Sequence, residues 1–147
     1  MGIKMLLPLM FLTAFAACTE LESMVDIKEL LSGQDCSLPS FEVSSDKTSS
    51  IPELDNIPYL KMVESLGEPS TSSRDDFGSF NGSDGILPEF YLPLMFRLRE
   101  VPIGETLTIE EKTWIVKGNC MLTIWYEVSG ETLKSIANLY YDATTDF

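Results

Sequence analysis

The residues best suited by their chemistry to hold a ligand are three aspartates around the glycine-rich residues 78–85. They are Asp75, Asp76 and Asp84. Carboxylate oxygens are ligands that Ca²⁺ prefers, and a glycine in the sixth position gives the EF-hand loop its sharp turn. With either suitable glycine in that position, the first ligand position falls on a phenylalanine, Phe77 or Phe80. We therefore predict a solvated loop and no bound metal.

Two pairs of adjacent carboxylates, Glu110-Glu111 and Asp75-Asp76, are candidates for acid–base catalysis. Such chemistry requires that burial raise the pKa of one member. Neighbours along a strand point to opposite faces, so we expect both pairs to be solvated and neither to form a dyad. The chain also has no histidine, which excludes His-based triads, His metal ligands and imidazole chemistry. We predict that the protein is not an enzyme and has no cofactor.

The charge of the chain limits its partners. In 147 residues, enough for one modest domain, ten Lys and Arg stand against 23 Asp and Glu, a formal net charge of −13. The phosphate backbone of a nucleic acid would be repelled, so we expect no nucleic-acid binding. An anionic bilayer surface would offer no electrostatic attraction either, so we expect membrane attachment only through a lipid anchor.

Met1–Ala17 has the pattern of an export signal. Lys4 precedes an apolar run that ends in small residues and is shorter than the roughly 20 residues of a membrane span. Two cleavage sites remain open. Residues 14–16, Ala-Phe-Ala, fit the pattern of ordinary secretion, whereas residues 15–18, Phe-Ala-Ala-Cys, are similar to the bacterial lipobox, in which the cysteine becomes the lipidated first residue.

The three cysteines, Cys18, Cys36 and Cys120, bear on this choice. An odd thiol in an exported protein needs an explanation, and lipidation of Cys18 leaves an even pair in an oxidising compartment. We therefore favour lipidation. Cys36 and Cys120 either form a disulfide or stay free, because a buried free cysteine is an ordinary core residue. A bridge would tie the N-terminal segment to the predicted sheet and stabilise it by about 2–4 kcal/mol.

The composition divides the rest of the chain into two parts. Residues 18–51, serine-rich from residue 32 onwards, are predicted to form a tether or irregular arm with a short helix near Val25–Leu31. Residues 52–147 are predicted to form the domain. Its clearest helix spans Tyr59–Leu66, where apolar residues recur at helical spacing before Gly67.

Alternating apolar residues predict an antiparallel sheet. The strongest run is Cys120–Val128, in which every even-numbered residue is apolar. Further strands are predicted at Arg74–Phe77, Glu89–Leu98, Thr106–Lys117 and Leu133–Tyr141, of which the last also fits helical spacing. The expected fold class is α+β, with short helices on one face of an antiparallel meander of about four strands. The other face is expected to be partly wet.

Trp125 and Tyr140 are the candidate contacts for a partner protein. Trp125 shares its strand face with Thr123 and Glu127, and Tyr140 shares its face with Lys134 and Asn138, so each is expected on a partly polar face. If these faces coincide, the two rings form an aromatic patch of the kind that anchors protein interfaces.

The order of these elements resembles that of small envelope lipoproteins. The resemblance rests on the lipobox, the polar tether, the helix end Leu-Gly-Glu-Pro at residues 66–69, and the strand Leu-Thr-Ile-Trp-Tyr at residues 122–126 before a glycine turn. The fold looks like that of the outer-membrane assembly lipoproteins of the BamE/SmpA type and of β-lactamase-inhibitor-like repeats. From about Pro52 to the end, this implies a curved sheet with helices on one side and a binding or scaffolding role without catalytic residues.

We therefore expect a lipid-anchored protein of the bacterial cell envelope, in the outer membrane, that binds another envelope or secreted protein. Two alternatives remain. The first is an inhibitor or immunity protein, whose acidic surface masks a toxin or an enzyme. The second is a binder of glycans or small ligands, whose aromatic residues stack on sugars.

Overall fold

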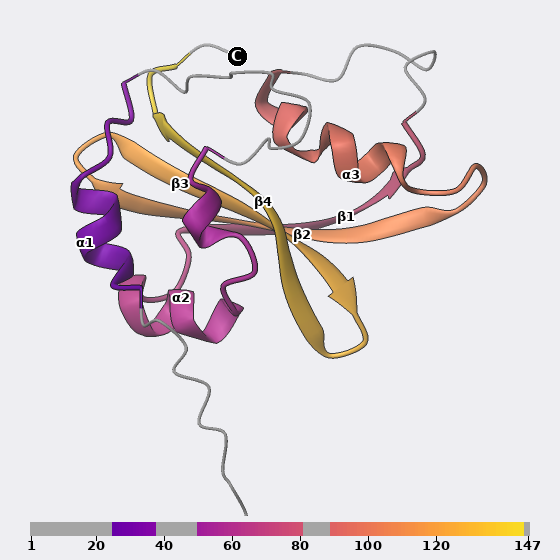
Figure 1. Cartoon of the computed structure of the whole chain (residues 1–147), viewed down its shortest axis with the longest axis horizontal. Coiled ribbons are helices and arrows are strands. Elements are labelled where there is room, and N and C mark those ends of the chain that lie inside the picture. Colours follow the sequence, from indigo (N-terminus) through magenta and orange to yellow (C-terminus); the bar gives the residue numbers. More distant parts are fainter. Residues whose placement is uncertain (1–24, 38–49, 81–88, 146–147) are drawn as a thin grey trace, which may run out of the picture.

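The computed structural model describes residues 25–37, 50–80 and 89–145 (Figure 1). One antiparallel sheet has the order β1-β2-β3-β4, so each strand pairs with the next along the chain. The strands are β1 (Thr71–Gly78), β2 (Thr106–Lys117), β3 (Cys120–Ser129) and β4 (Thr132–Asp142). The helices are α1 (Ile27–Ser32), α2 (Tyr59–Leu66) and α3 (Met95–Arg99), with 3₁₀ segments η1 (Pro52–Leu54) and η2 (Glu89–Leu94). The α+β class is confirmed. The predicted export signal and Cys18 lie outside the described residues.

The helix predicted over Tyr59–Leu66 is confirmed as α2, with the same bounds. Gly67 closes it by donating its N–H to the carbonyl of Val63, at a φ of 81° that favours glycine over every other residue. α1 begins just after Asp26, whose carboxylate accepts hydrogen bonds from the first backbone N–H groups of the helix. Local capping chemistry therefore sets where both helices begin or end.

The segment Leu133–Tyr141, for which the sequence fitted both strand and helix, is a strand and belongs to β4. Its register with β3 shifts where Trp125 opposes Ala137 but Tyr126 opposes Ser135, so that Ile136 is the extra residue of a β-bulge. A bulge changes the face to which later residues point. Leu133 accordingly packs on one face of the sheet and Ala137 on the other.

Helices cover both faces of the sheet, which corrects the expectation of one covered face. On face A, the helices α1, η1 and α2 pack over one set of strand residues: Trp114, Leu122, Ile124, Tyr126 and Tyr140. On face B, η2 and α3 pack over the other set: Ile109, Trp125, Ala137, Leu139 and Tyr141. Figure 1 shows α2 below the strands and α3 above them. The sheet is therefore the middle of three layers.

The cover of face B comes from the segment Glu89–Leu98, which was predicted to be a strand. It forms η2 and most of α3 instead. Pro93 has no N–H to donate to a sheet ladder, and Leu94 and Leu98, spaced one helical turn apart, are both buried against the sheet. The segment buries its apolar residues more completely as a helix over the sheet than it would as a further edge strand.

The arm predicted over residues 18–51 is also corrected, because its described parts belong to the core. Ile27, Leu31 and Cys36 are 3%, 2% and 6% exposed, and Ile51 is 2% exposed. The short helix predicted near Val25–Leu31 is confirmed as α1, but it packs on face A and does not act as a spacer. Residues 38–49, within the predicted tether, lie outside the described residues.

Candidate functional site

Trp125 and Tyr140, the expected contact residues, do not form an exposed patch. Trp125 is 0% exposed on face B, and Tyr140 is 4% exposed on face A, so the two rings lie on opposite sides of the sheet. Trp125 is covered by η2, where the ring of Phe90 lies 5.3 Å from it between centroids. The prediction of a shared aromatic surface is therefore wrong, because the segment that covers Trp125 was taken for a strand.

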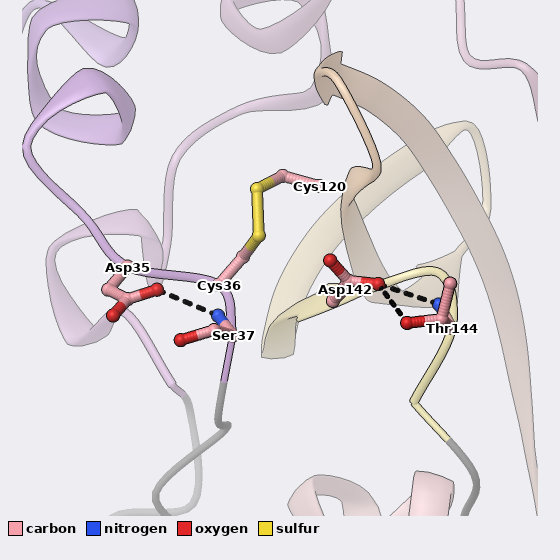
Figure 2. The surroundings of a disulfide bond; sticks show 6 residues. All are labelled: Asp35, Cys36, Ser37, Cys120, Asp142 and Thr144. Carbon is pink, nitrogen blue, oxygen red and sulfur yellow. Dashed lines mark hydrogen bonds between the residues drawn. A yellow bond between two sulfur atoms is a disulfide. The ribbon is translucent and has the colours of Figure 1, made fainter.

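Cys36 and Cys120 form a disulfide (Figure 2). The bridge joins the segment after α1 to the first residue of β3, across a sequence separation of 84 residues. Short hydrogen-bonded turns lie on either side of it. Hydrogen bonds from Ser37 lower the pKa of Asp35, and hydrogen bonds from Thr144 lower the pKa of Asp142, the cross-strand partner of Cys120. The pairing that the sequence left open is thus made, and it fixes α1 to the sheet.

Glu110 and Glu111 point to opposite faces, as predicted, but neither is simply solvated. On face A, the carboxylate of Glu110 forms two ion pairs. Its oxygens lie 2.9 Å from Nζ of Lys112 and 3.7 Å from Nη1 of Arg74. Lys112 is itself buried, with its Nζ 4.7 Å from the centre of the Tyr59 ring. Two cations therefore balance the carboxylate on this face.

Glu111 has a different environment on face B. Its Oε2 accepts a hydrogen bond of 2.9 Å from Nε1 of Trp125. Burial raises the pKa of the Glu111 carboxyl, the hydrogen bond from Trp125 opposes that shift, and the charge of Asp75 adds to it. Burial and the charges of Glu111 and Asp75 also raise the pKa of the Tyr91 hydroxyl. Two carboxylates thus share a partly buried aromatic surface.

β1 brings these acidic residues to one edge of the sheet. In its register with β2, Arg74 opposes Glu110 and Asp75 opposes Ile109, so that Asp75 is the diagonal neighbour of Glu111. Within the described parts of the chain, no cation forms an ion pair with Asp75 or Glu111. The result is a strand edge that is electrically balanced on face A and negative on face B. We call β1 and these β2 carboxylates the acidic edge.

A groove of about 560 Å³ lies elsewhere, between α1, the end of α2 and the end of β2. Lys28 and Lys117 line it, and Ile115, which is 63% exposed, contributes an apolar wall. Glu64 is the one carboxylate in the lining, so the groove is less acidic than a chain with a formal net charge of −13 is as a whole. It contains none of the residues selected from the sequence.

The described residues contain no group of three or more His, Cys, Asp or Glu placed to hold a metal ion. Asp75 and Asp76 lie on β1, and Asp84, the third candidate calcium ligand, lies outside the described residues. No helix in the described ranges is long and apolar enough to cross a membrane. Comparisons with protein-family models, with curated proteins and with solved structures found no match.

The acidic edge is the feature that sequence reasoning missed. Arg74–Phe77 was predicted to be an edge strand, which is confirmed by β1, but its alignment with Glu110 and Glu111 depends on the β1–β2 register. The available signal was the concentration of four carboxylates on two neighbouring predicted strands. Each pair was judged only against its sequence neighbour, whereas the diagonal pair Asp75 and Glu111 forms between strands.

Proposed function

We propose that this protein is a lipid-anchored protein of the bacterial cell envelope that binds another protein and does not catalyse a reaction. The observation that carries the proposal is the Cys36–Cys120 disulfide, because structural disulfides persist in oxidising compartments outside the cytoplasm. The export pattern of Met1–Ala17 supports the same location, and lipidation of Cys18 accounts for the third cysteine.

The position of α1 changes how the anchor would be arranged. Because Ile27 already belongs to the core, the linker after Cys18 would comprise only residues 19–26. Eight residues reach at most about 28 Å when fully extended. The domain would therefore be held close to the membrane surface, and not at the end of a long arm.

A relationship to lipoproteins of the BamE/SmpA type stays part of this proposal. In its favour, α2 ends at Leu66 and the residues after it lead directly into β1. The position of α3 on face B departs from the one-sided arrangement of helices that the resemblance implies. A structure of the domain with a bound envelope protein would test whether the relationship extends to the mode of binding.

The test of the anchor is mass spectrometry of the full chain, expressed in a Gram-negative host and recovered from the membrane fraction. We expect a mature N-terminus at Cys18 that carries acyl chains, and a linked peptide pair that contains Cys36 and Cys120. The matched control is Cys18→Ser, which should release the protein to the soluble fraction with the disulfide intact. An N-terminus beyond Cys18, or free thiols at both remaining cysteines of the exported protein, would contradict the proposal.

An inhibitor or immunity protein is the second candidate, and the acidic edge favours it. An exposed strand that carries Asp75 and Asp76, with Glu111 next to Asp75 on face B, is complementary to a basic site on a toxin or an enzyme. Crosslinking in cells followed by identification of the captured protein separates the candidates, because a resident envelope protein supports the first and a basic toxin or enzyme the second. The burial of Trp125 and Tyr140 removes two aromatic residues that a glycan-binding surface could have used.

A further inference from the structure

The two edges of the sheet differ in how their backbone groups are used. At the outer edge of β4, Ser50 donates its N–H to the carbonyl of Asn138 at 3.1 Å, and the N–H of Tyr140 donates to the Ser50 hydroxyl at 2.7 Å. The side chain of Asn138, 0% exposed, also exchanges two hydrogen bonds of 2.9 Å with the backbone of Ile51. Ser50 and Ile51, just before η1, therefore cover this edge at Asn138 and Tyr140.

The outer edge of β1 has no comparable cover among the described residues. Every residue of β1 except Phe77 is exposed, and no backbone hydrogen bond joins its outer edge to another of the described segments. An edge strand leaves alternate N–H and C=O groups available for pairing. We propose that β1 binds an extended, basic segment of a partner protein, which adds to the sheet as a fifth strand next to β1.

Charge selects the partner. Asp75 and Asp76 are exposed in the middle of β1 and point to opposite faces of the sheet, and the partly buried Glu111 adds a second carboxylate to Asp75 on face B. Burial raises the pKa of the Glu111 carboxyl, and the negative charge of Asp75 on the same face adds to that shift. A lysine or arginine on the incoming strand beside Asp75 relieves this repulsion. An acidic segment increases it.

The pleat of β1 adds a second requirement. Asp75 and Phe77 are two residues apart and therefore share face B, where the Phe77 ring lies 5.9 Å from that of Tyr91. Residues opposite them on an added strand are likewise two apart, in either strand direction. The matching pattern is a basic residue and an apolar residue separated by one position.

A second copy of this chain fits the edge less well. Each copy has a formal net charge of −13, and antiparallel pairing centred on Asp75 would place the same carboxylate of both copies face to face. Like charges directly opposite each other destabilise a strand pair. The occupant we propose is therefore a different, basic protein, and dimerisation through β1 is an outcome that would overturn the proposal.

The test uses the full chain in detergent and a synthetic peptide of eight residues. Every second residue of this peptide is threonine, and the residues between the threonines are lysine and valine in turn. Its control has glutamate in place of lysine. We expect the lysine peptide to bind and to shift the NMR signals of β1 amides more than those of α1 amides. The glutamate peptide should bind at least about tenfold more weakly.

Charge reversals on the protein locate the site. Asp75→Lys should weaken binding of the lysine peptide about tenfold, and the milder Asp75→Asn should weaken it by an intermediate factor. The matched control is Glu53→Lys, an exposed carboxylate of η1 beside the covered β4 edge, which should change the affinity by less than about twofold. Equal effects of Asp75→Lys and Glu53→Lys would mean non-specific attraction and would overturn the proposal.

Backbone pairing is tested separately. Successive N–H groups of a strand point to opposite edges, so one version of the lysine peptide is N-methylated at the odd-numbered amides and a second version at the even-numbered amides. Only one peptide edge pairs with β1, so the two versions should differ in affinity by about tenfold. Equal affinities, or a dimer of the chain through β1 in analytical ultracentrifugation, would overturn the proposal. The inference rests on the proposed binding role and not on the lipid anchor. If the peptide does not bind, the mass spectrometric result at Cys18 is unaffected. If Cys18 is not lipidated, the peptide-binding result is unaffected.

Discussion

The two faces of the sheet are held in different ways. Face A is covered by segments that precede β1, and the Cys36–Cys120 disulfide links this cover to β3 covalently. Face B is covered by η2 and α3, which lie between β1 and β2 in the chain and are held in the described residues by side-chain packing and by a backbone hydrogen bond from Phe80 to Leu98. The entropic cost of closing a loop grows with its length. The distant cover therefore gains from a covalent link, whereas the local cover of face B can be held without one.

Two kinds of side-chain contact stand out on face B. The ring of Trp125 packs against Phe90 and Tyr91, with ring centres 5.3 and 6.2 Å away. The guanidinium of Arg97 on α3 makes hydrogen bonds of 3.0–3.2 Å to both carboxylate oxygens of Glu127 on β3. These contacts make face B the region where single substitutions should loosen one layer without the other.

The largest effect is expected from Trp125→Ala. Removing this fully buried ring should lower the free energy of unfolding by about 3–5 kcal/mol, measured by chemical denaturation. Where the variant still folds, hydrogen exchange should increase more in α3 than in α1. The matched variant on face A is Trp114→Ala, which removes the hydrogen bond to the Gly67 carbonyl and should loosen α2 instead. Uniform loss of protection in both variants would show that the faces do not open separately.

The next effect is expected from loss of the disulfide. The double variant Cys36→Ala with Cys120→Ala should lower the free energy of unfolding by about 2–4 kcal/mol, because the unfolded chain is no longer constrained. Hydrogen exchange should increase in α1 first and leave α3 protected. Reduction of the unmodified protein with dithiothreitol provides the control and should reproduce both results. A larger increase in α3 than in α1 would contradict the comparison of the two faces.

A smaller effect is expected from Arg97→Ala. Loss of the ion pair with Glu127 should lower the free energy of unfolding by about 1 kcal/mol, a modest value because the pair is partly exposed. The change should be weaker at high salt. Arg99→Ala, which removes an exposed arginine from the same helix, is the control and should have less effect. Equal effects of the two variants would mean that the contact with Glu127 does not hold α3.

The smallest effect depends on pH and comes from Glu111. Burial raises the folded-state pKa of this carboxyl, so its contribution to stability is present in acid and is lost as pH rises through the folded-state pKa. Glu111→Gln keeps an acceptor for the Trp125 N–H and should be more stable than the unmodified protein at pH 7. The difference should disappear below about pH 4, where the unfolded carboxyl is also protonated.

Asp75→Asn is the comparison for this variant, because the charge of Asp75 contributes to the raised pKa of Glu111. It should reproduce part of the gain at neutral pH. Thermal denaturation at a series of pH values measures both variants. The quantity to compare is the stability of Glu111→Gln minus that of the unmodified protein. A smaller difference at pH 7 than at pH 4 would contradict the assigned burial.

Much of the fold could be predicted because it follows from local patterns. The period of two in Cys120–Val128, the helical stripe of Tyr59–Leu66 and the stop at Gly67 are each contained within about ten residues. Glu89–Leu98 was misassigned because its run of aromatic and aliphatic residues suits a strand and a buried helix equally well. The choice depended on what the segment packs against, and that information lies in β2, β3 and β4.

The sequence alone determined the elements with strong local signals, the absence of histidine chemistry and the strongly acidic charge. Tertiary structure decided the burial of Trp125, the pairing of Cys36 with Cys120 and the approach of Asp75 to Glu111. The physical reason is the range of the interactions. Capping and periodicity act between residues close in the chain, whereas burial, disulfide formation and strand register join residues that only the folded chain brings together.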